Sequence, residues 1–585
     1  MRSCTDRRCV SRPWRYPGGA RRCRSPPRSR CSCSPGSRGR RVSATPSTAS
    51  SRLWSPEMLP APMTLDSLRR AVVGAGAAGV AAPSASAIQC RLPAWELPAL
   101  ADRLAPLGAR CQFLAAADTR ATGDEFTLAY MFAPPQLSPS VTVLVAVPAA
   151  VARFASLATR SFAASRFERE IHDLFGLVPE GHPDLRRLAL HQYWPEGYHP
   201  LRRDVAPRTD FVDSGEPFPF RHVEGEGIFE VTVGPVHAGI IEPGHFRFSA
   251  DGETIVNLET RLGFVHKGTE KLFEGLALDR APALAERISG DTSVGHALAY
   301  CQALEALAGC TVPPRAGRLR VVLLELERIY NHVGDVGMIV NDTGFAFGHA
   351  HCLRIREELL RLNERLTGHR LLRGAVVPGG VTGPITTARV AEAATTVESL
   401  VADFAAIVRL CLDNTTVLER LQGTGQLTEQ TATEMQVVGL VGRASGIDAD
   451  LRRDVPFAAY GETGVHVSVY GTGDVWARTM VRLDEAREAA RLVREAMRLD
   501  DRGAVRAPIP PLTAGAHAFG LVEAWRGPIW HWVLADGPAS LGRVKVVDPS
   551  FRNWPALEYA VLKNIVPDFP LCNKSFNLSY SGNDL

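Results

Sequence analysis

Helical periodicity in the second half of the chain constrains the fold more than any other feature of the sequence. Residues 319–330 (LRVVLLELERIY) are apolar on almost every side, which predicts a central buried helix. Residues 353–366 carry apolar side chains at i, i+4, i+7 and i+11, the pattern of a helix that rests one face on a core. That stripe consists of Ile355, Leu359, Leu362 and Leu366.

Two more helices are predicted further along, at 391–412 and 483–499. The second of these would have Asp484 and Glu485 in its first turn, where the helix dipole favours anions. The chain after Tyr300 is therefore predicted to be mostly helical.

Strand patterns precede this helical part. Residues 126–132 and 141–147 are rich in β-branched and aromatic residues and are bounded by Pro and Gly, which predicts two neighbouring strands. Alternating stretches at 228–234 and 254–272 flank the segment 234–248, whose Gly- and Pro-punctuated loop carries His237 and His245. The predicted class is α+β: a small N-terminal α+β domain, then a large, mainly helical domain with a short β-hairpin region.

Composition divides the chain. Residues 1–57 hold 14 Arg, no Lys and two acidic residues, so they carry +12, and the rest must carry −8 to give the total of +4. This Arg-, Ser- and Pro-rich segment has no apolar periodicity and cannot bury enough surface to fold. We expect a non-native extension, with the true start at Met58 or Met63, or else a disordered basic tail.

The predicted domains are 58–205 and 223–585, joined by a polar, Pro-rich linker at 206–222.

Charge and cysteine content exclude several classes of protein. The acidic remainder shows no basic face, so no nucleic-acid partner is expected. Five of the 12 cysteines lie between Cys4 and Cys33, and the others are scattered without a C-x-x-C pair. This predicts reduced thiols and no iron–sulfur or zinc site within this chain. The sequence contains no strongly apolar run long enough to cross a bilayer, so no membrane span is expected.

Three short patterns suggest functions that their context does not favour. Gly74, Gly76 and Gly79 spell G-x-G-x-x-G, but a dinucleotide site needs a strand before the motif and an acidic strand end after it. The same stretch, 68–87, imitates an export signal, although its Ala- and Gly-rich centre is only weakly hydrophobic. His349 and His351 would point to different faces of one helix, which disfavours a shared metal.

Charged motifs between 167 and 204 follow one another in a specific order. They read FEREIHDLFG (167–176), GHPDLRRL (181–188) and HPLRRD (199–204), and together they resemble the signature of the thirty-kilodalton subunit of complex I. Taken as residues alone, paired Arg and carboxylates suggest either a docking surface or an ordinary salt-bridged face.

Two distant segments carry the second resemblance. AERISGDTSVGHALAY (285–300) and SFNLSYSGNDL (575–585) resemble the metal-binding segments of nickel–iron hydrogenase large subunits. Each of those segments supplies a C-x-x-C pair, because soft thiolates suit Ni and Fe. The matching positions here are Ser289, Thr292, Ser579 and Gly582, which leads us to expect no nickel–iron centre.

Further motifs, among them HKGTEK (266–271) and ERIYNH (327–332), resemble the forty-nine-kilodalton subunit of complex I, so the likeness spans roughly residues 90–585. This order of parts is that of fused complex I subunits and of the large subunits of group 4, formate hydrogenlyase-type hydrogenases. The resemblance implies a subunit of a membrane-associated oxidoreductase complex that is inactive alone. Implied partners are a small iron–sulfur subunit, similar to the twenty-kilodalton subunit of complex I, and antiporter-like membrane subunits.

The resemblance also implies a location, cofactors and site residues. The chain would lie peripherally on the cytoplasmic side of the cell membrane and bind no cofactor alone, beside a 4Fe–4S cluster of a partner, with a quinone as candidate substrate and coupled ion movement. Glu270 inherits a proton-relay role, or else pairs with a nearby Lys or Arg. Arg287 would lie against the cluster and raise its potential. Asp291 and His296 would line the emptied cavity with His237 and His245, while Gly290 replaces the quinone-binding tyrosine of the forty-nine-kilodalton subunit.

Three alternatives remain open from the sequence. A scaffold subunit would keep the fold and the docking but not the redox chemistry. A free-standing nucleotide-dependent enzyme would use Gly74 to Gly79, and a working hydrogenase would need the missing thiolates.

Overall fold

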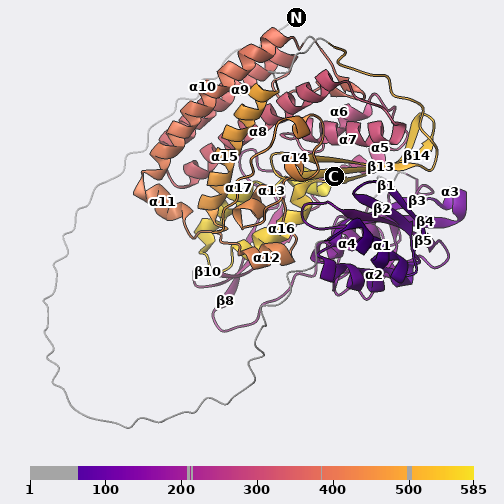
Figure 1. Ribbon diagram of the computed structural model, residues 1–585. Helices are drawn as coiled ribbons and strands as arrows, with labels where there is room; N and C mark the ends of the chain where they lie inside the picture. Colours follow the sequence, from indigo (N-terminus) through magenta and orange to yellow (C-terminus); the bar gives the residue numbers. More distant parts are fainter. Residues whose placement is uncertain (1–62, 207–210, 213–214, 384, 497–502) are drawn as a thin grey trace, which may run out of the picture. The chain divides into compact units, whose positions relative to one another are not determined.

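The computed structural model describes residues 63–206, 211–212, 215–383, 385–496 and 503–585 (Figure 1). The predicted extension at 1–57 lies outside these residues, as do 207–210 and 213–214 of the predicted linker. The class is α+β, as predicted, with an N-terminal sheet domain followed by a large helical part.

A five-stranded sheet forms the N-terminal part, with the order β1-β2-β5-β4-β3. The two predicted strands are confirmed as β4 and β5, antiparallel neighbours in which Phe126 lies opposite Val147. The other three strands were not predicted. For β3 (RCQFLAAAD) the reason is that the strand is buried on both faces, so its apolar residues do not alternate with polar ones. The strands are β1 (Ala78–Ser84), β2 (Ala87–Arg91), β3 (Arg110–Asp118), β4 (Glu125–Ala133) and β5 (Ser140–Pro148).

Helix α4 (Phe162–Phe175) packs on this sheet and carries the first charged motif. Its acidic residues point inward: Glu168 accepts a hydrogen bond from the Leu157 N–H (2.7 Å), and Asp173 accepts one from the Leu188 N–H (2.8 Å). Glu170 is buried as well. These three carboxylates therefore do not lie on an exposed face: Glu168 and Asp173 bind backbone N–H groups of their own domain, and Glu170 pairs with Lys545 of the large part (2.7 Å).

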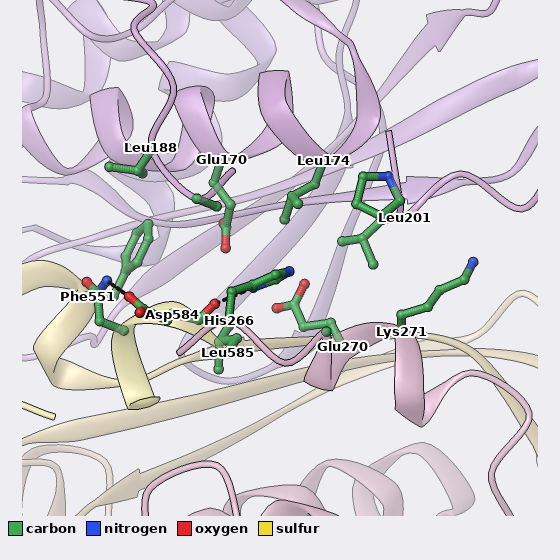
Figure 2. Close-up of a pocket in the computed structure, with 14 residues that line it drawn as sticks. Glu170, Leu174, Leu188, Leu201, His266, Glu270, Lys271, Phe551, Asp584 and Leu585 are labelled. Atoms are coloured by element: carbon green, nitrogen blue, oxygen red, sulfur yellow. Dashed lines mark hydrogen bonds between the residues drawn. The ribbon is translucent and has the colours of Figure 1, made fainter. Parts of the chain in front are cut away.

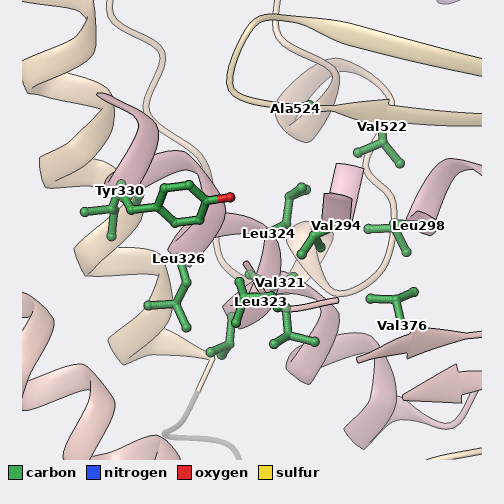
Figure 3. Packing of buried hydrophobic residues seen from close by; sticks show 14 of the residues in the cluster. Val294, Leu298, Val321, Leu323, Leu324, Leu326, Tyr330, Val376, Val522 and Ala524 are labelled. Atoms are coloured by element: carbon green, nitrogen blue, oxygen red, sulfur yellow. The ribbon is translucent and has the colours of Figure 1, made fainter. Parts of the chain in front are cut away.

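Five long helices build the core of the large part. Helix α8 is buried along most of its length, as predicted for residues 319–330, and the predicted apolar stripe of α9 is buried too. Figure 3 shows Val321, Leu324 and Leu326 of α8 packed with side chains from the neighbouring helix α7. The helices are α7 (Ser293–Ala308), α8 (Pro314–Asp342), α9 (Ala346–Thr367), α10 (Thr387–Leu412) and α15 (Val475–Glu495).

The start of α15 differs from the prediction. The helix begins at Val475, where the Asp474 side chain caps it by accepting from the Ala477 N–H (2.8 Å). Asp484 and Glu485 are consequently in mid-helix. Glu485 is buried against the Arg443 guanidinium (2.8 Å), so ion pairing and not the helix dipole stabilises its charge.

Two three-stranded antiparallel sheets complete the large part. The sheet β8 (Ile228–Val233), β9 (His245–Asp251) and β10 (Thr254–Arg261) agrees with the predicted strands. The sheet β13 (His517–Glu523), β14 (Pro528–Gly537) and β15 (Ser540–Val547) was not predicted and adds strands to a second half that is mostly helical, as expected. This second sheet contacts the N-terminal domain, since the Trp530 and Phe113 rings stack 5.5 Å apart. The exact domain boundaries stay a prediction.

Candidate functional site

Two segments 290 residues apart meet at one point of the fold. The Ser289 Oγ lies 2.9 Å from the Ser579 Oγ, and the Gly582 N–H donates to the Ser579 Oγ (2.9 Å). Thr292 stands at the start of α7, and Ser579 caps the short C-terminal helix α18 (Tyr580–Asp584). With Asp291 and Arg526 these four positions form what we call the polar cluster.

Arg526 occupies the middle of the polar cluster. Its guanidinium binds the Asp291 carboxylate through two hydrogen bonds of 2.7 Å and also donates to the Thr292 Oγ1 (3.1 Å). The guanidinium stacks over the Trp525 ring at 3.8 Å. Burial by itself would raise the pKa of Asp291, but Arg526 and the bonds from Ser289 and Thr292 outweigh it and lower the pKa to about 2. The pair is therefore ionised at neutral pH.

The residues of the polar cluster do not fit a nickel–iron centre. Hydroxyl groups and a hydrogen atom stand where thiolates would be required, and a serine hydroxyl does not ionise near neutral pH. The Arg526 guanidinium, a permanent cation, lies within hydrogen-bonding distance of Thr292 and Asp291 and would repel a metal ion. Within the described ranges no three His, Cys, Asp or Glu side chains are grouped so that they could hold a metal ion.

His296 lies behind the polar cluster in a buried chain of polar side chains. Its Nε2 is 3.1 Å from the Asp548 Oδ2, and its Nδ1 is 3.3 Å from the His531 Nε2. Asp548 in turn packs against Gly582, where a Cβ atom would come within 2.7 Å of the carboxylate. Burial and the neighbouring His296 hold the pKa of His531 well below its ordinary value, so His531 is neutral.

Glu327 is a site residue that the sequence-based reasoning did not select. It is fully buried in α8 and accepts hydrogen bonds from the Val294 (2.6 Å) and Gly295 (3.0 Å) N–H groups at the start of α7. Burial raises its pKa to about 8 against the opposing effect of these bonds, and the Asp291 carboxylate adds to the increase. The available signal was a charged side chain inside a stretch predicted to be buried, but Glu325 and Arg328 of the same stretch carry that signal equally.

The raised pKa of Glu327 predicts a pH dependence of stability. The unfolded chain releases this proton near the ordinary glutamate pKa, about 4.3, and the folded chain releases it near 8, so rising pH favours unfolding over this interval. The contribution of Glu327 is complete below the lower value and falls by at most about 1.4 kcal/mol per pH unit. Urea unfolding of wild type and of Glu327→Gln from pH 5 to 8 measures this pH dependence. If the free energies of unfolding of the two proteins change with pH in parallel, Glu327 does not have a raised pKa.

Glu270 belongs to a second buried cluster, on helix α5 (Thr269–Phe273). Its carboxylate contacts Arg543 (2.6 Å) and Lys545 (3.1 Å), and Lys545 also binds Glu170 of the N-terminal domain (2.7 Å). Figure 2 shows Glu170 and Glu270 facing a small cavity of about 20 Å³, room for about one water molecule. Burial alone would raise the pKa of Glu270, but the charges of Arg543 and Lys545 outweigh burial, and the pKa is lowered. This agrees with the expectation that Glu270 pairs with a nearby Lys or Arg.

The remaining predicted site residues lie apart from the polar cluster. Arg287 is exposed and donates to the Ala283 carbonyl. The His237 Nε2 lies 2.8 Å from the Gly244 carbonyl and closes its own loop, while His245 begins β9 and packs beside Phe220. The predicted site residues thus fall into separate groups instead of lining one chamber, and their roles stay predictions.

The glycine motif has the wrong structural order for a dinucleotide site. Gly74 ends helix α1 (Leu65–Gly74) and Gly79 lies in strand β1, whereas the fingerprint requires a strand before the glycines and a helix after them. His349 and His351 lie on α9 and contact different groups, the Gly337 carbonyl and the Phe347 ring.

Comparison with known proteins follows the same division of the chain. Residues 92–210 match the family model of the respiratory-chain NADH dehydrogenase 30 kDa subunit, and residues 342–513 match that of the 49 kDa subunit. The chain is 34% identical to hydrogenase-4 component G of Escherichia coli K12 over 454 residues, 76% of this chain and 78% of that protein. The chain belongs to the family of hydrogenase-4 component G, and it joins a 30 kDa-type and a 49 kDa-type part.

The chain also resembles other proteins, to different degrees. Formate hydrogenlyase subunit 5 of Escherichia coli K12 is 34% identical over 460 residues, which are 76% of this chain and 79% of that protein. The fused C/D subunit of the NADH-quinone oxidoreductase of Bdellovibrio bacteriovorus is 25% identical, with 70% and 80% coverage. A chain from the membrane-bound sulfane sulfur reductase, an archaeal respiratory membrane complex, superposes with a TM-score of 0.58 at 25% identity, covering 62% of this chain and all of that one. Like these fused large subunits, the protein is a subunit of an oxidoreductase complex.

Proposed function

We propose that this chain and a small iron–sulfur subunit together form the substrate-reduction site of a membrane-associated, complex I-like oxidoreductase. The polar cluster carries the proposal, because the two segments that would hold a metal in a hydrogenase still converge although their thiolates are gone. A meeting point of two segments that presents hydroxyls and an ion pair would suit a substrate that accepts hydrogen bonds. A quinone is such a substrate.

An exposed apolar loop supports a protein partner at this place. Val236 and Ile240 are 82% and 94% exposed, an unfavourable arrangement for two aliphatic side chains unless another surface covers them. The same loop contacts the C-terminal segment, because the Ser581 N–H, between Ser579 and Gly582 of the polar cluster, donates to Glu242 (3.0 Å). A partner that covers the loop would therefore lie next to the segment that carries Ser579.

The chemistry requires electrons from the partner and protons from this chain. Reduction of a quinone to a quinol takes two electrons, which a 4Fe–4S cluster of the small subunit would supply one at a time, and two protons. Asp291 and Arg526 would orient the substrate through their remaining hydrogen-bonding capacity. Glu327, whose pKa burial raises to about 8 and which the Asp291 charge influences, would supply a proton. The exposed cation of Arg287 would stabilise the reduced cluster.

Attachment to the membrane would depend on partners. Among the described residues no helix is both long and apolar enough to cross a bilayer. We infer a peripheral position on the cytoplasmic side, held by antiporter-like membrane subunits through which ion movement is coupled to reduction.

The test combines purification with a redox titration. The full chain is isolated from membranes in mild detergent, its companions are identified, Ni and Fe are assayed, and the cluster signal is titrated by electron paramagnetic resonance. Arg287→Ala is expected to make the midpoint potential of the partner's cluster more negative, while Arg389→Ala, an exposed arginine on α10, leaves it unchanged. Stoichiometric nickel, or a wild-type chain without an iron–sulfur companion, would overturn the proposal.

A scaffold without redox function is the second candidate, favoured by one observation. The Arg526–Asp291 ion pair already satisfies most of the hydrogen-bonding groups of the polar cluster. If the complex assembles with its cluster but Arg287→Ala and Asp291→Asn leave the potential and the turnover unchanged, the scaffold function is the correct one.

A further inference from the structure

A second cavity, of about 250 Å³, lies between the N-terminal domain and the large part and is distinct from the polar cluster. Apolar side chains from both parts line it, including Leu137 on one side and Val437, Ile447 and Leu451 on the other. The volume is just below the roughly 300–1,000 Å³ range of small-molecule pockets, so the cavity suits a small ligand with an aliphatic portion.

One wall of this cavity contains a buried arginine without a counter-charge. Arg552, on helix α16 (Pro549–Ala560), is 6% exposed, and its Nη2 donates to the Gln436 carbonyl at 2.7 Å. Its Nε has no hydrogen-bond partner, and within the described part of the chain no carboxylate lies within 4.0 Å of the guanidinium. Burial lowers the pKa of Arg552 only to about 10, so the group stays charged at neutral pH. A buried charge without a partner is unfavourable, and an anion bound in the cavity would remove that cost.

Two carboxylates in the same walls restrict which anion fits. Asp450 binds Arg452 (2.7 Å) and Glu523 binds Arg443 (2.8 Å), so neither neutralises Arg552. Their negative charges would repel an anion of high charge, such as a nucleotide. A single negative charge joined to an aliphatic body satisfies both the free guanidinium and the apolar wall.

We propose that this cavity binds a small amphiphilic monocarboxylate, of the medium-chain fatty-acid class, with its carboxylate on Arg552 and its chain against Val437, Ile447 and Leu451. The ligand would bridge the N-terminal domain and the large part. This site is separate from the proposed reduction site and does not depend on it.

The test is a calorimetric titration of the full chain with octanoate. Arg552→Gln keeps a donor for the Gln436 carbonyl and removes the charge, so it is expected to weaken binding by about tenfold or more, the effect of one charge-assisted hydrogen bond. Octanol, the uncharged probe, should bind wild type correspondingly weakly. Arg110→Gln, which alters an exposed arginine at the edge of the same cavity, should change the affinity by less than about twofold.

A second variant separates loss of the site from loss of folding. Ile447→Trp fills the apolar side while leaving Arg552 in place, and it should abolish octanoate binding with an unchanged thermal unfolding profile. Equal affinity of Arg552→Gln and wild type, or equal affinity for octanol and octanoate, would overturn the proposal. Competition by inorganic phosphate, or tighter binding of a short-chain phosphatidylglycerol, would assign the site to a phosphate and overturn the carboxylate assignment.

Discussion

Arg526→Met is expected to destabilise the folded chain by about 3 kcal/mol. Breaking a buried ion pair by removing one partner typically costs about 3–5 kcal/mol, and the value lies at the lower end here because the Asp291 side chain is 36% exposed and can be hydrated. Methionine keeps an apolar contact with the Trp525 ring, so the loss reports mainly on charge. Urea unfolding at pH 7 measures the change.

A double-mutant cycle isolates the pair. The double variant Arg526→Met with Asp291→Asn should be less destabilised than the sum of the two single changes predicts. The reason is that Asp291→Asn removes the carboxylate that Arg526→Met leaves without a partner. Arg389→Ala is the matched surface control and should lie within about 0.5 kcal/mol of wild type. A loss below about 1 kcal/mol for Arg526→Met would mean that the pair contributes no more than an exposed one.

Lys545→Met is expected to have the larger effect, about 3–5 kcal/mol. Lys545 is 2% exposed and lies between two carboxylates, Glu170 of the N-terminal domain and Glu270 of the large part. Without the ammonium group, Glu270 retains Arg543 but Glu170 has no cation left in contact. We expect the variant to lose the contact between the two parts first, visible as faster proteolysis and as an earlier unfolding step of the N-terminal domain.

The pH dependence of this variant has a definite sign. Burial already raises the pKa of Glu170 in the wild type, and Lys545 opposes the increase, so its removal raises the pKa further. A carboxyl with a raised folded pKa stabilises most below its unfolded value and loses this contribution as pH rises, so Lys545→Met should recover stability toward pH 5. Adding Glu170→Gln should restore stability at pH 7, while Lys563→Met, an exposed control, should do nothing. A Lys545→Met protein with unchanged unfolding would show that the Lys545 ion pairs are not needed to hold the two parts together.

Periodicity predicted the elements that pack by one face or are buried throughout. The stripe from Ile355 to Leu366 and the apolar run at 319–330 are α9 and α8 because their apolar spacing matches the turn of a helix. It missed β3, which does not alternate, and the start of α15, where the buried Arg478 and Arg482 resemble surface residues in the sequence. The partner that keeps Arg482 buried, Asp335, is remote in sequence, so no local pattern indicates it.

The site was predictable in part. The segments around Ser289 and Ser579 could be singled out in the sequence, as could the family that they indicate. That Arg526 would fill the cluster, that Glu327 would be buried beneath it, and that Glu270 would pair with Arg543 were not visible, since each contact joins residues far apart in the chain.

The sequence by itself determined the class of protein and the long helices, because these depend on local spacing and on the chemistry of single side chains. Only the tertiary structure decided which charges lie inside and which of them meet. Burial and pairing of a charge depend on what the folded chain places around it, and no local pattern records that neighbourhood.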